Sequence, residues 1–385
     1  MLISLGCIFL AALAFDAIGR RTRLPRVTLL LVFGFAIGPS GLDALPEMTG
    51  AWFPAVADIA LLMIGFLLGG RLTRSELRER GRLVIGFSVV VVTITFAVMA
   101  LGLFAIGVTP VVVGLLLAAI ATATDPAAVM DVVHGTRAKT PFARALLAIV
   151  AIDDVWGLII FSVALAVGLL VQGDAAAAVV MHAAWDLGGA LLLGVGLGIP
   201  MAYLTGRVDP GEPSLFEALG LVFLCGGLAR WLDVSFLLSA VALGTTVTNL
   251  ARHHIRPFHA IEGIEWPFMI LFFVLAGAAL DLSALAHIGP WFTAYIVLRI
   301  AGRLAGGWLG GCLPPADANL RRWMGIALLP QAGVALGMAL VASQRFPEAG
   351  EVVLPVIIAS TIFFEVLGPI ATRFALDRTA AGDER

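Results

Sequence analysis

Two adjacent acidic residues lie inside an apolar run that is long enough to cross a bilayer. Between residues 145 and 171 the charged side chains are Asp153 and Asp154. A spanning helix needs about 20 predominantly apolar residues, and at a rise of about 1.5 Å per residue the pair lies near its middle. A charge at that depth costs at least about 2.5 kcal/mol on insertion scales. The pair is therefore a candidate functional site, although two acids that cap a broken helix or bind a neighbouring cation would also explain it.

The composition indicates that the rest of the chain is equally apolar. Of its 385 residues, 60% are hydrophobic and 13% are charged, which predicts an all-α polytopic membrane protein. A net charge of −2 gives no reason to expect a nucleic-acid partner. The three cysteines, Cys7, Cys225 and Cys312, have neither metal-ligand nor disulfide spacing and are expected to be packing residues.

Apolar runs predict about thirteen transmembrane helices, the first of which is a spanning helix rather than a cleaved signal peptide. The second and ninth runs are short. The predicted spans are 2–18, 25–41, 52–70, 83–107, 110–134, 142–171, 182–205, 214–231, 234–250, 265–284, 289–312, 321–343 and 351–375.

Basic residues are concentrated in the loops that follow the odd-numbered spans, whereas the loops after even-numbered spans are acidic or nearly uncharged, with Arg230 and Arg345 as exceptions. Because cytoplasmic loops are enriched in lysine and arginine, we expect the N-terminus outside and the C-terminus in the cytoplasm. The residues that carry this expectation are Arg20, Arg21, Arg23, Arg71, Arg74, Arg78, Arg80, Arg82, Arg137, Lys139, Arg207, Arg252, Arg256, Arg373 and Arg378.

The chain contains an internal repeat with an offset of about 205–212 residues. Equivalent elements are separated by an odd number of spans, which predicts two copies of inverted topology, a pattern typical of secondary transporters. Four pairs in order support the repeat: 153–157 with 364–368, Gly65 with Gly277, Gly34 with Gly244, and 124–126 with 329–331.

Two spans at equivalent places in the repeat are interrupted by proline. The fifth contains Thr124, Asp125 and Pro126, and the twelfth contains Pro330 and Gln331. A proline removes a backbone donor and clashes with the preceding turn. A simple kink would explain either span alone, but paired interruptions predict two crossing discontinuous helices at a transport site. We expect Asp125 and Gln331 to neutralise the half-helix ends.

Two arginines lie one turn apart in the eleventh span. Arg299 and Arg303 are spaced i, i+4 and so share a helix face. Cations at this depth need partners, unless they snorkel to a headgroup. The acids available at that depth are Asp153, Asp154, Asp125 and Glu365.

These residues, taken together, resemble the monovalent cation:proton antiporter-2 family, of the bacterial sodium/proton antiporter type with a double aspartate. The resemblance covers almost the whole chain, and the ordered set of blocks carries it rather than any single one. The matching blocks are 24–26, Gly34 with 37–42, 66–69 with Leu77, 123–126, 152–154 with 157–159, 272–277 and 299–303.

The resemblance implies specific roles for the site residues. The acid matching Asp154 binds the transported cation, here the metal Na⁺, and carries a proton, and the acid matching Asp153 forms a salt bridge with the base at position 303. That base is more often lysine in electrogenic members, whereas this chain has Arg303. Because arginine keeps its proton, a mechanism in which this base releases one is disfavoured.

The resemblance also implies an organisation for the chain. It predicts a transmembrane antiporter domain over 1–376, with a transport bundle at about 52–171 and 265–376, dimerisation helices at about 1–50 and 182–250, and a short cytoplasmic tail at 377–385. It implies a homodimer in the lipid bilayer of the bacterial cytoplasmic membrane, with no cofactor and no enzymatic activity.

The residues therefore predict a secondary transporter that exchanges a monovalent cation for protons by alternating access. Carboxylate and carbonyl oxygens suit a hard cation such as Na⁺, and protons compete for the same oxygens. Exchange of K⁺ or Li⁺, a sodium-coupled organic-anion symporter, an intramembrane aspartyl protease and a passive channel are the alternatives. The intact acid pair favours a two-proton electrogenic cycle, whereas a permanent Asp153–Arg303 pair would give one-for-one exchange.

Overall fold

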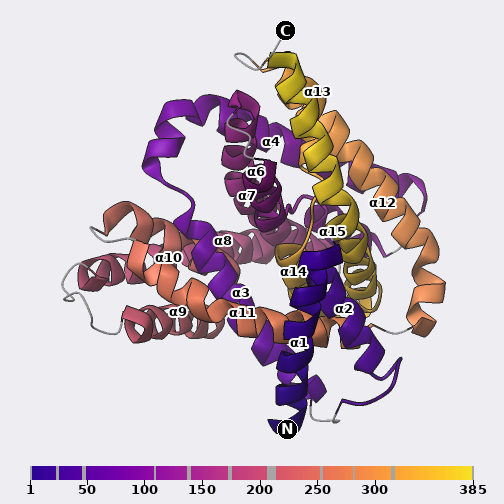
Figure 1. Cartoon of the computed structure of the whole chain (residues 1–385). Helices are drawn as coiled ribbons and strands as arrows, with labels where there is room; N and C mark the ends of the chain where they lie inside the picture. The colour runs from indigo at the N-terminus through magenta and orange to yellow at the C-terminus, as the bar shows by residue number, and fades with distance from the viewer. Residues whose placement is uncertain are drawn as a thin grey trace. The chain divides into compact units, whose positions relative to one another are not determined.

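The structure is a computed structural model that describes residues 2–22, 26–45, 49–107, 110–136, 140–171, 176–205, 214–251, 255–280, 282–313 and 317–383 (Figure 1). These residues form fifteen helices and no strand. The helices are α1 (Leu2–Thr22), α2 (Arg26–Ile37), α3 (Thr49–Gly70), α4 (Arg74–Ala105), α5 (Val111–Ile120), α6 (Pro126–Thr136), α7 (Pro141–Val171), α8 (Ala176–Thr205), α9 (Ser214–Trp231), α10 (Phe236–Leu250), α11 (Ile255–Ala278), α12 (Leu282–Gly310), α13 (Ala318–Ala327), α14 (Gly333–Arg345) and α15 (Pro347–Asp383).

The predicted apolar runs correspond to these helices one by one, except that two runs are each divided into two helices. The run 110–134 forms α5 and α6, and the run 321–343 forms α13 and α14. Six helices, α3, α4, α7, α8, α11 and α15, are long and apolar enough to cross a membrane. The all-helical prediction and both interruptions are confirmed, and the number of spans stays a prediction.

The chain divides into two compact units. The first unit comprises 1–46, 80–168 and 273–385, and the second unit comprises 47–79 and 169–272. These boundaries differ from the predicted transport bundle and dimerisation helices, since 1–46 belongs to the first unit and 47–79 to the second. The functional division stays a prediction.

In the second unit, glycines allow α3 and α10 to cross at backbone contact. A Cβ atom added at Gly69 would lie 2.2 Å from the carbonyl oxygen of Val241, and one added at Gly244 would lie 2.1 Å from that of Phe66. This unit also contains Arg230, one of the two exceptions to the pattern of basic loops. Arg230 of α9 forms a salt bridge with Asp58 of α3 at 2.5 Å, which accounts for this exception.

The first unit contains an equivalent crossing between α2 and the end of α11. A Cβ atom added at Gly34 would lie 2.0 Å from the carbonyl oxygen of Val274, and one at Gly277 would lie 2.1 Å from that of Leu31. Side chains larger than glycine would therefore separate these two helices.

The two crossings give the internal repeat a structural basis and correct one of its pairs. Gly34 corresponds to Gly244, as predicted, but the counterpart of Gly277 is Gly69 rather than Gly65. An added Cβ at Gly65 would meet the side chain of Ala240 at 3.0 Å, whereas Gly69 and Gly277 both abut a backbone carbonyl. The pairing with Gly65 was therefore wrong by one helical turn.

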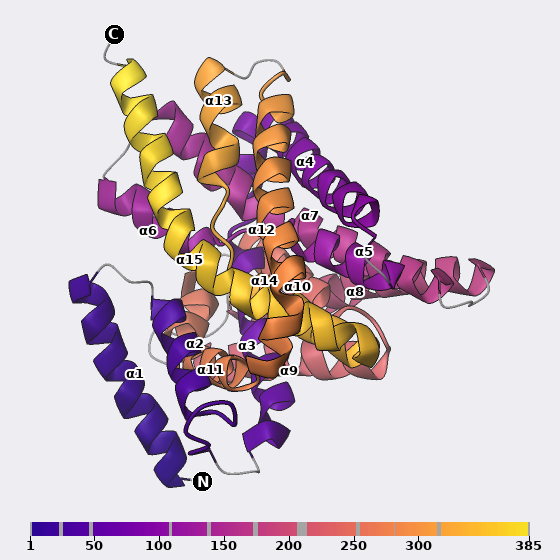
Figure 2. The same cartoon turned by 90° about the vertical axis from the view of Figure 1, so that its right-hand side faces the viewer.

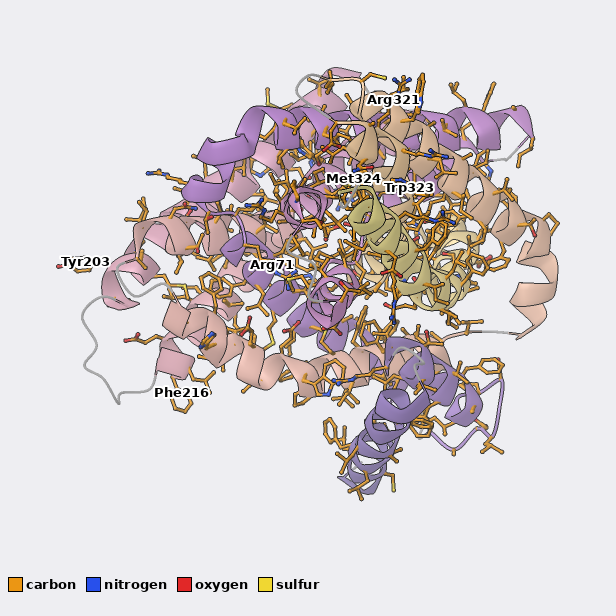
Figure 3. The ribbon with its side chains drawn as sticks, turned by 45° about the horizontal axis from the view of Figure 1, so that its top comes forward. Arg71, Tyr203, Phe216, Arg321, Trp323 and Met324 are labelled. Atoms are coloured by element: carbon orange, nitrogen blue, oxygen red, sulfur yellow. The ribbon has the colours of Figure 1, made fainter. Side chains whose placement is uncertain are left out.

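The first unit also packs α12, α13 and α15 next to one another, as two views show (Figures 1 and 2). Met324 of α13 is fully buried in a core that includes Leu376 of α15. Trp323 packs edge-on against Phe374 of α15. Figure 3 shows Trp323 and Met324 beside this helix. This core supports the interrupted segment between α13 and α14.

The orientation prediction depends mostly on loop residues of which the structure says little. Arg23, Arg137, Lys139, Arg207 and Arg252 lie outside the described residues. The orientation of the chain therefore stays a prediction.

Candidate functional site

The two adjacent acids lie midway along α7, inside the first unit. Asp153 and Asp154 are both fully buried, with 0% of each side chain exposed. A buried carboxylate is costly unless it is paired or hydrogen-bonded. The partners of each acid therefore define the site, and the two acids have different ones.

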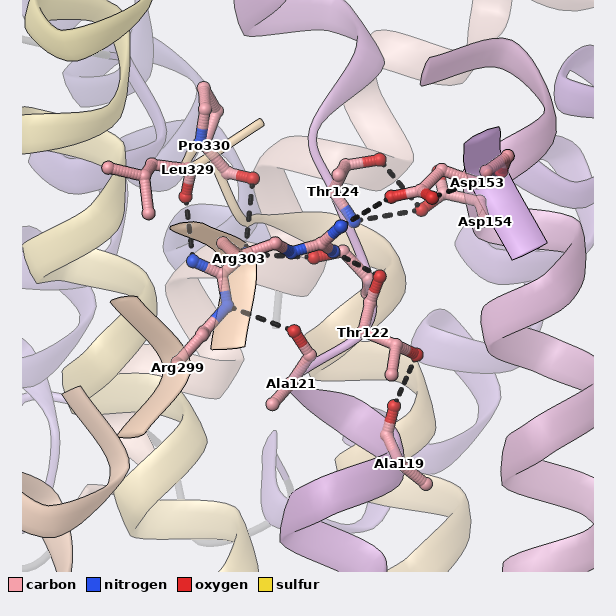
Figure 4. Close-up of polar contacts among 12 residues, drawn as sticks. Ala119, Ala121, Thr122, Thr124, Asp153, Asp154, Arg299, Arg303, Leu329 and Pro330 are labelled. Carbon is pink, nitrogen blue, oxygen red and sulfur yellow. Dashed lines mark hydrogen bonds and ion pairs between the residues drawn. The ribbon is translucent and has the colours of Figure 1, made fainter. Parts of the chain in front are cut away.

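Asp154 is held by the interruption between α5 and α6. The helix α5 ends at Ile120, and α6 begins at Pro126, a residue that is favoured in the first turn of a helix. The intervening Thr124 donates from its backbone amide to Asp154 Oδ1 at 3.0 Å and from its hydroxyl to the same oxygen at 3.2 Å (Figure 4). These two bonds fix the carboxyl group against the unwound segment.

The second oxygen of Asp154 is a buried acceptor. Its Oδ2 atom is buried and has no hydrogen-bond partner among the described residues. A buried acceptor without a partner carries a desolvation penalty of about 1–3 kcal/mol. This oxygen can therefore gain free energy by binding a proton or a cation.

A glycine of α7 brings the acids close to this interruption. A Cβ atom added at Gly157 would lie 3.1 Å from the hydroxyl oxygen of Thr122. In the equivalent place of the repeat, a Cβ atom added at Gly368 of α15 would lie 2.6 Å from Cα of Pro330. Each long helix therefore approaches one interruption through a glycine.

Asp153 faces a different set of partners. Arg303 Nη1 donates to Asp153 Oδ2 at 2.7 Å, and the hydroxyl of Ser88 donates to Oδ1 at 3.2 Å. Arg303 is itself fully buried, and its Nη2 atom donates to the carbonyl oxygen of Thr122. The guanidinium therefore ties Asp153 of α7 to the unwound segment after α5.

Arg299 binds backbone carbonyls rather than the acids that the sequence indicated. It donates to Ala121 O at 3.1 Å, Ala123 O at 2.9 Å, Leu329 O at 2.7 Å and Pro330 O at 3.4 Å (Figure 4). These carbonyls lie just after the C-terminal ends of α5 and α13, where helix dipoles place partial negative charge. One buried cation therefore compensates two half-helix ends.

The second interruption is held by a tyrosine. Gln331 Nε2 donates to the Tyr295 hydroxyl oxygen at 3.0 Å, and that hydroxyl donates to Gln331 Oε1 at 3.3 Å. Both side chains are fully buried. Gln331 therefore acts at this break through Tyr295 of α12.

The remaining two predicted residues meet at the first interruption. Asp125 Oδ1 accepts a bond from the Ala127 amide at 3.0 Å, which satisfies a free donor at the start of α6. Glu365 of α15 interacts electrostatically with Asp125. The two side chains are 9% and 3% exposed, so this carboxyl pair is buried.

The structure thus brings the predicted residues into one region of the first unit, and it adds Ser88 and Tyr295. Tyr295 had a detectable signal, because 295, 299 and 303 follow one another at intervals of four and so share a face of α12. Ser88 had none, since a lone serine in an apolar helix is common and its partner is 65 residues away.

Comparison with known proteins identifies a matching family model. The model described as "Sodium/hydrogen exchanger, transmembrane" matches residues 6–378. This range includes every residue of the site described above.

Two curated proteins are similar in sequence. An ammonium/H⁺ antiporter subunit of Alkalihalophilus pseudofirmus, AmhT, is 22% identical over 349 residues, which is 90% of this chain and 84% of that protein. Cation/H⁺ antiporter 18 of Arabidopsis thaliana is 22% identical over 74% of this chain and 38% of its own length.

Solved structures of the sodium proton antiporter MjNhaP1 of Methanocaldococcus jannaschii share the fold. One, determined at pH 8, has a TM-score of 0.80 at 18% identity and covers 97% of both chains. A second, from electron microscopy, has a TM-score of 0.78 at 19% identity and covers 98% of this chain and 97% of that chain.

Proposed function

Because the chain belongs to the sodium/hydrogen exchanger family of multi-pass transmembrane transporters, we propose that it exchanges Na⁺ for protons by alternating access, with Asp154 as the shared binding residue. The observation that carries this proposal is the asymmetry of the Asp154 carboxyl. Thr124 holds Oδ1, while Oδ2 is buried and accepts no hydrogen bond from the residues that the structure describes. A carboxyl group that is hydrogen-bonded at one oxygen and available at the other suits a site that binds and releases a cation or a proton.

The proposed exchange follows from competition for one carboxyl group. A dehydrated Na⁺ prefers hard oxygen ligands, and Asp154 supplies a carboxylate next to the hydroxyl of Thr124. A proton on Asp154 removes the negative charge that attracts the cation. The site therefore carries either the cation or the proton, and movement of each loaded form across the membrane produces exchange.

The surrounding residues have positioning and charge-compensating roles in this proposal. Arg303 holds Asp153 and the segment after α5, and Arg299 holds both interruptions by their carbonyls. Pro126 and Pro330 maintain the breaks by limiting helical hydrogen bonding. In this proposal Asp153 contributes negative charge and a fixed position for Arg303, while Asp154 binds the transported cation or proton.

Ammonium is a second candidate cargo. One relative is named an ammonium/H⁺ antiporter subunit. An ammonium ion can donate hydrogen bonds to a carboxylate, and Asp154 Oδ2 is an acceptor to which no described residue donates. Potassium exchange and sodium-coupled symport of an organic anion are the further alternatives.

The proposed setting is the bacterial cytoplasmic membrane, with the N-terminus outside and the C-terminus in the cytoplasm, and a homodimer as the assembly. The basic loops support this orientation, and the family resemblance supports the dimer. The protein is proposed to act without a cofactor.

The proposed function is tested by cation-dependent proton flux in proteoliposomes. With a pH gradient imposed, addition of Na⁺, Li⁺, K⁺ or ammonium is followed by dequenching of a pH-sensitive dye. We expect Asp154→Asn to abolish this flux, because the amide keeps the size of the side chain but does not ionise. Asp377→Asn, at an exposed position of α15, is the matched control and is expected to transport normally.

The result distinguishes the alternatives. Proton release with Na⁺ alone supports sodium selectivity. Release with ammonium supports the second candidate only where it exceeds that of protein-free liposomes, into which neutral ammonia diffuses. Substantial flux in the folded, inserted Asp154→Asn protein would remove Asp154 from its proposed role.

A further inference from the structure

Four exposed arginines gather at one end of the first unit, where the end of α12, the start of α13 and the last turns of α15 lie together (Figures 1 and 2). They are Arg321, Arg322, Arg373 and Arg378. The stretches that form this end, 304–313, 317–327 and 370–380, carry two acids, Asp317 and Asp377. Positive charge therefore exceeds negative charge on these stretches, which we call the basic end.

Two of these arginines lie over indole rings at α13. The guanidinium carbon of Arg321 is 4.3 Å from the ring centre of Trp308 of α12, and that of Arg322 is 5.2 Å from the ring centre of Trp323. The face of an aromatic ring attracts a cation without using its N–H donors. The forked donors of both guanidinium groups therefore stay available to an anion.

The row of rings and arginines continues onto α15. Trp323 packs edge-on against Phe374 with 5.6 Å between the ring centres, and the guanidinium carbon of Arg378 is 5.1 Å from the ring centre of Phe374. Within the described part of the chain, the salt bridges do not include Arg321, Arg322 or Arg378. Three cations at the basic end are thus held by rings rather than neutralised by carboxylates.

The fourth arginine and the two acids are already engaged locally. Arg373 lies 4.0 Å from Asp377, one turn further along α15. The carboxylate of Asp317 accepts the amide of Leu320 at 2.8 Å and so caps α13. The acids therefore do not face the three arginines that are held by rings.

Close helix packing fixes where these arginines lie. A Cβ atom added at Gly311 of α12 would be 2.2 Å from Cα of Arg321, so α13 crosses α12 at backbone contact. Thr372 of α15 donates from its hydroxyl to the carbonyl oxygen of Ala327 at 3.0 Å. The basic end is therefore carried by three helices that are tied to one another.

The depth of the basic end matches a membrane surface. Trp308 lies nine residues after the buried Arg299, which is roughly 13 Å along the helix. Arg378 lies ten residues after Gly368, whose position abuts Pro330, or roughly 15 Å. Half of the hydrocarbon core of a bilayer is also about 15 Å. With the buried site near the midplane, the rings and arginines lie at the level of the lipid headgroups.

Apolar side chains continue from the rings towards the midplane. Leu304 precedes Trp308 by four residues and is 41% exposed, and Ile370 precedes Phe374 by four residues and is 63% exposed. Residues four apart share a helix face. The surface is therefore amphipathic, with cations at one level and apolar side chains one turn deeper, as a phospholipid requires.

We propose that the basic end binds an anionic phospholipid, with its headgroup phosphate at Arg321, Arg322 and Arg378 and its acyl chains along α12 and α15. Arginine pairs with phosphate through two parallel hydrogen bonds, and basic clusters next to spanning helices attract anionic lipids. With the predicted orientation, this lipid belongs to the cytoplasmic leaflet. The inference does not depend on the proposed antiport, and it assigns the lipid a stabilising role, because the three helices hold the second interruption.

The test counts bound lipid by native mass spectrometry. Protein purified in a nonionic detergent is titrated with phosphatidylglycerol or with phosphatidylcholine of the same acyl chains, and we expect tighter binding of phosphatidylglycerol. Arg321→Gln, Arg322→Gln and Arg378→Gln should each weaken that binding about fivefold, the contribution of one basic residue near an anionic surface. The triple variant should weaken it on the order of a hundredfold.

The matched control is Arg74→Gln, which removes an exposed arginine of α4 in the second unit and should leave lipid binding unchanged. Equal binding of the two lipids by the wild type would overturn the inference. Binding by the triple variant as tight as that of Arg74→Gln would overturn it as well. Because the three substituted side chains are exposed, we expect the variants to fold, and the single changes test the proposal independently of the triple variant.

A second measurement separates a lipid from a soluble anion. We expect phosphatidylglycerol to raise the melting temperature of the wild type and of Arg74→Gln more than phosphatidylcholine does, and the triple variant to lose this difference. Inorganic phosphate at the same concentration should not reproduce the rise. An equal rise with inorganic phosphate would identify a site for a soluble anion and would refute the lipid site.

Discussion

At the scale of single residues, the buried arginines do more than balance charge. Arg303 donates to Asp153 at 2.7 Å and also to the carbonyl of Thr122. Removing one partner of a buried pair leaves an uncompensated charge, typically at a cost of about 3–5 kcal/mol. We therefore expect Arg303→Ala to lower the thermal stability of the purified protein strongly. Arg303→Lys should lower it less, because lysine keeps a positive charge opposite Asp153, although it lacks the forked donors for both contacts. Combining Arg303→Ala with Asp153→Asn should destabilise less than the sum of the single changes, and strict additivity in this cycle would count against the pair.

At the scale of helices, the crossings depend on glycines that admit a neighbouring backbone. A Cβ atom at Gly277 of α11 would lie 2.1 Å from the Leu31 carbonyl oxygen, whereas one at Gly263 of the same helix would meet nothing within 4 Å. We expect Gly277→Ala to destabilise the protein by about 1–3 kcal/mol, the range for overpacking. Gly263→Ala should be neutral or slightly stabilising, because alanine favours the helix. Melting temperatures in detergent compare the two variants, and equal values would contradict the close crossing.

At the scale of the whole molecule, the inverted repeat and the basic loops predict how the chain crosses the membrane. Asp43 follows the second predicted span, and Asp377 lies near the C-terminal end of α15. In a protein with its three cysteines replaced by serine, we expect Asp43→Cys to react with an impermeant maleimide in intact cells. Asp377→Cys should react only after the cells are permeabilised, because the C-terminus is expected to be cytoplasmic. The opposite pattern of labelling would invert the predicted orientation.

The helices, both interruptions and the buried acids could be predicted from the sequence because each depends on local chemistry. A run of apolar residues predicts a spanning helix by its length, and Pro126 and Pro330 interrupt helices by lacking an amide donor. Acids within an apolar run are recognisable as candidate functional residues, because a charge inside a membrane is costly. The offset of the internal repeat was also visible, to within one turn of a helix.

The partners of these residues were decided by the tertiary structure. Arg299 was expected to bind an acid, but the crossing of two interrupted helices presents it with four carbonyl oxygens instead. Asp125 and Glu365 interact electrostatically although they are 240 positions apart in the sequence. The correct counterpart of Gly277 emerged only from matching backbone contacts. These partners depend on where the helices cross in space. The residues that meet at a crossing lie far apart in the sequence, and local periodicity carries no information over such separations.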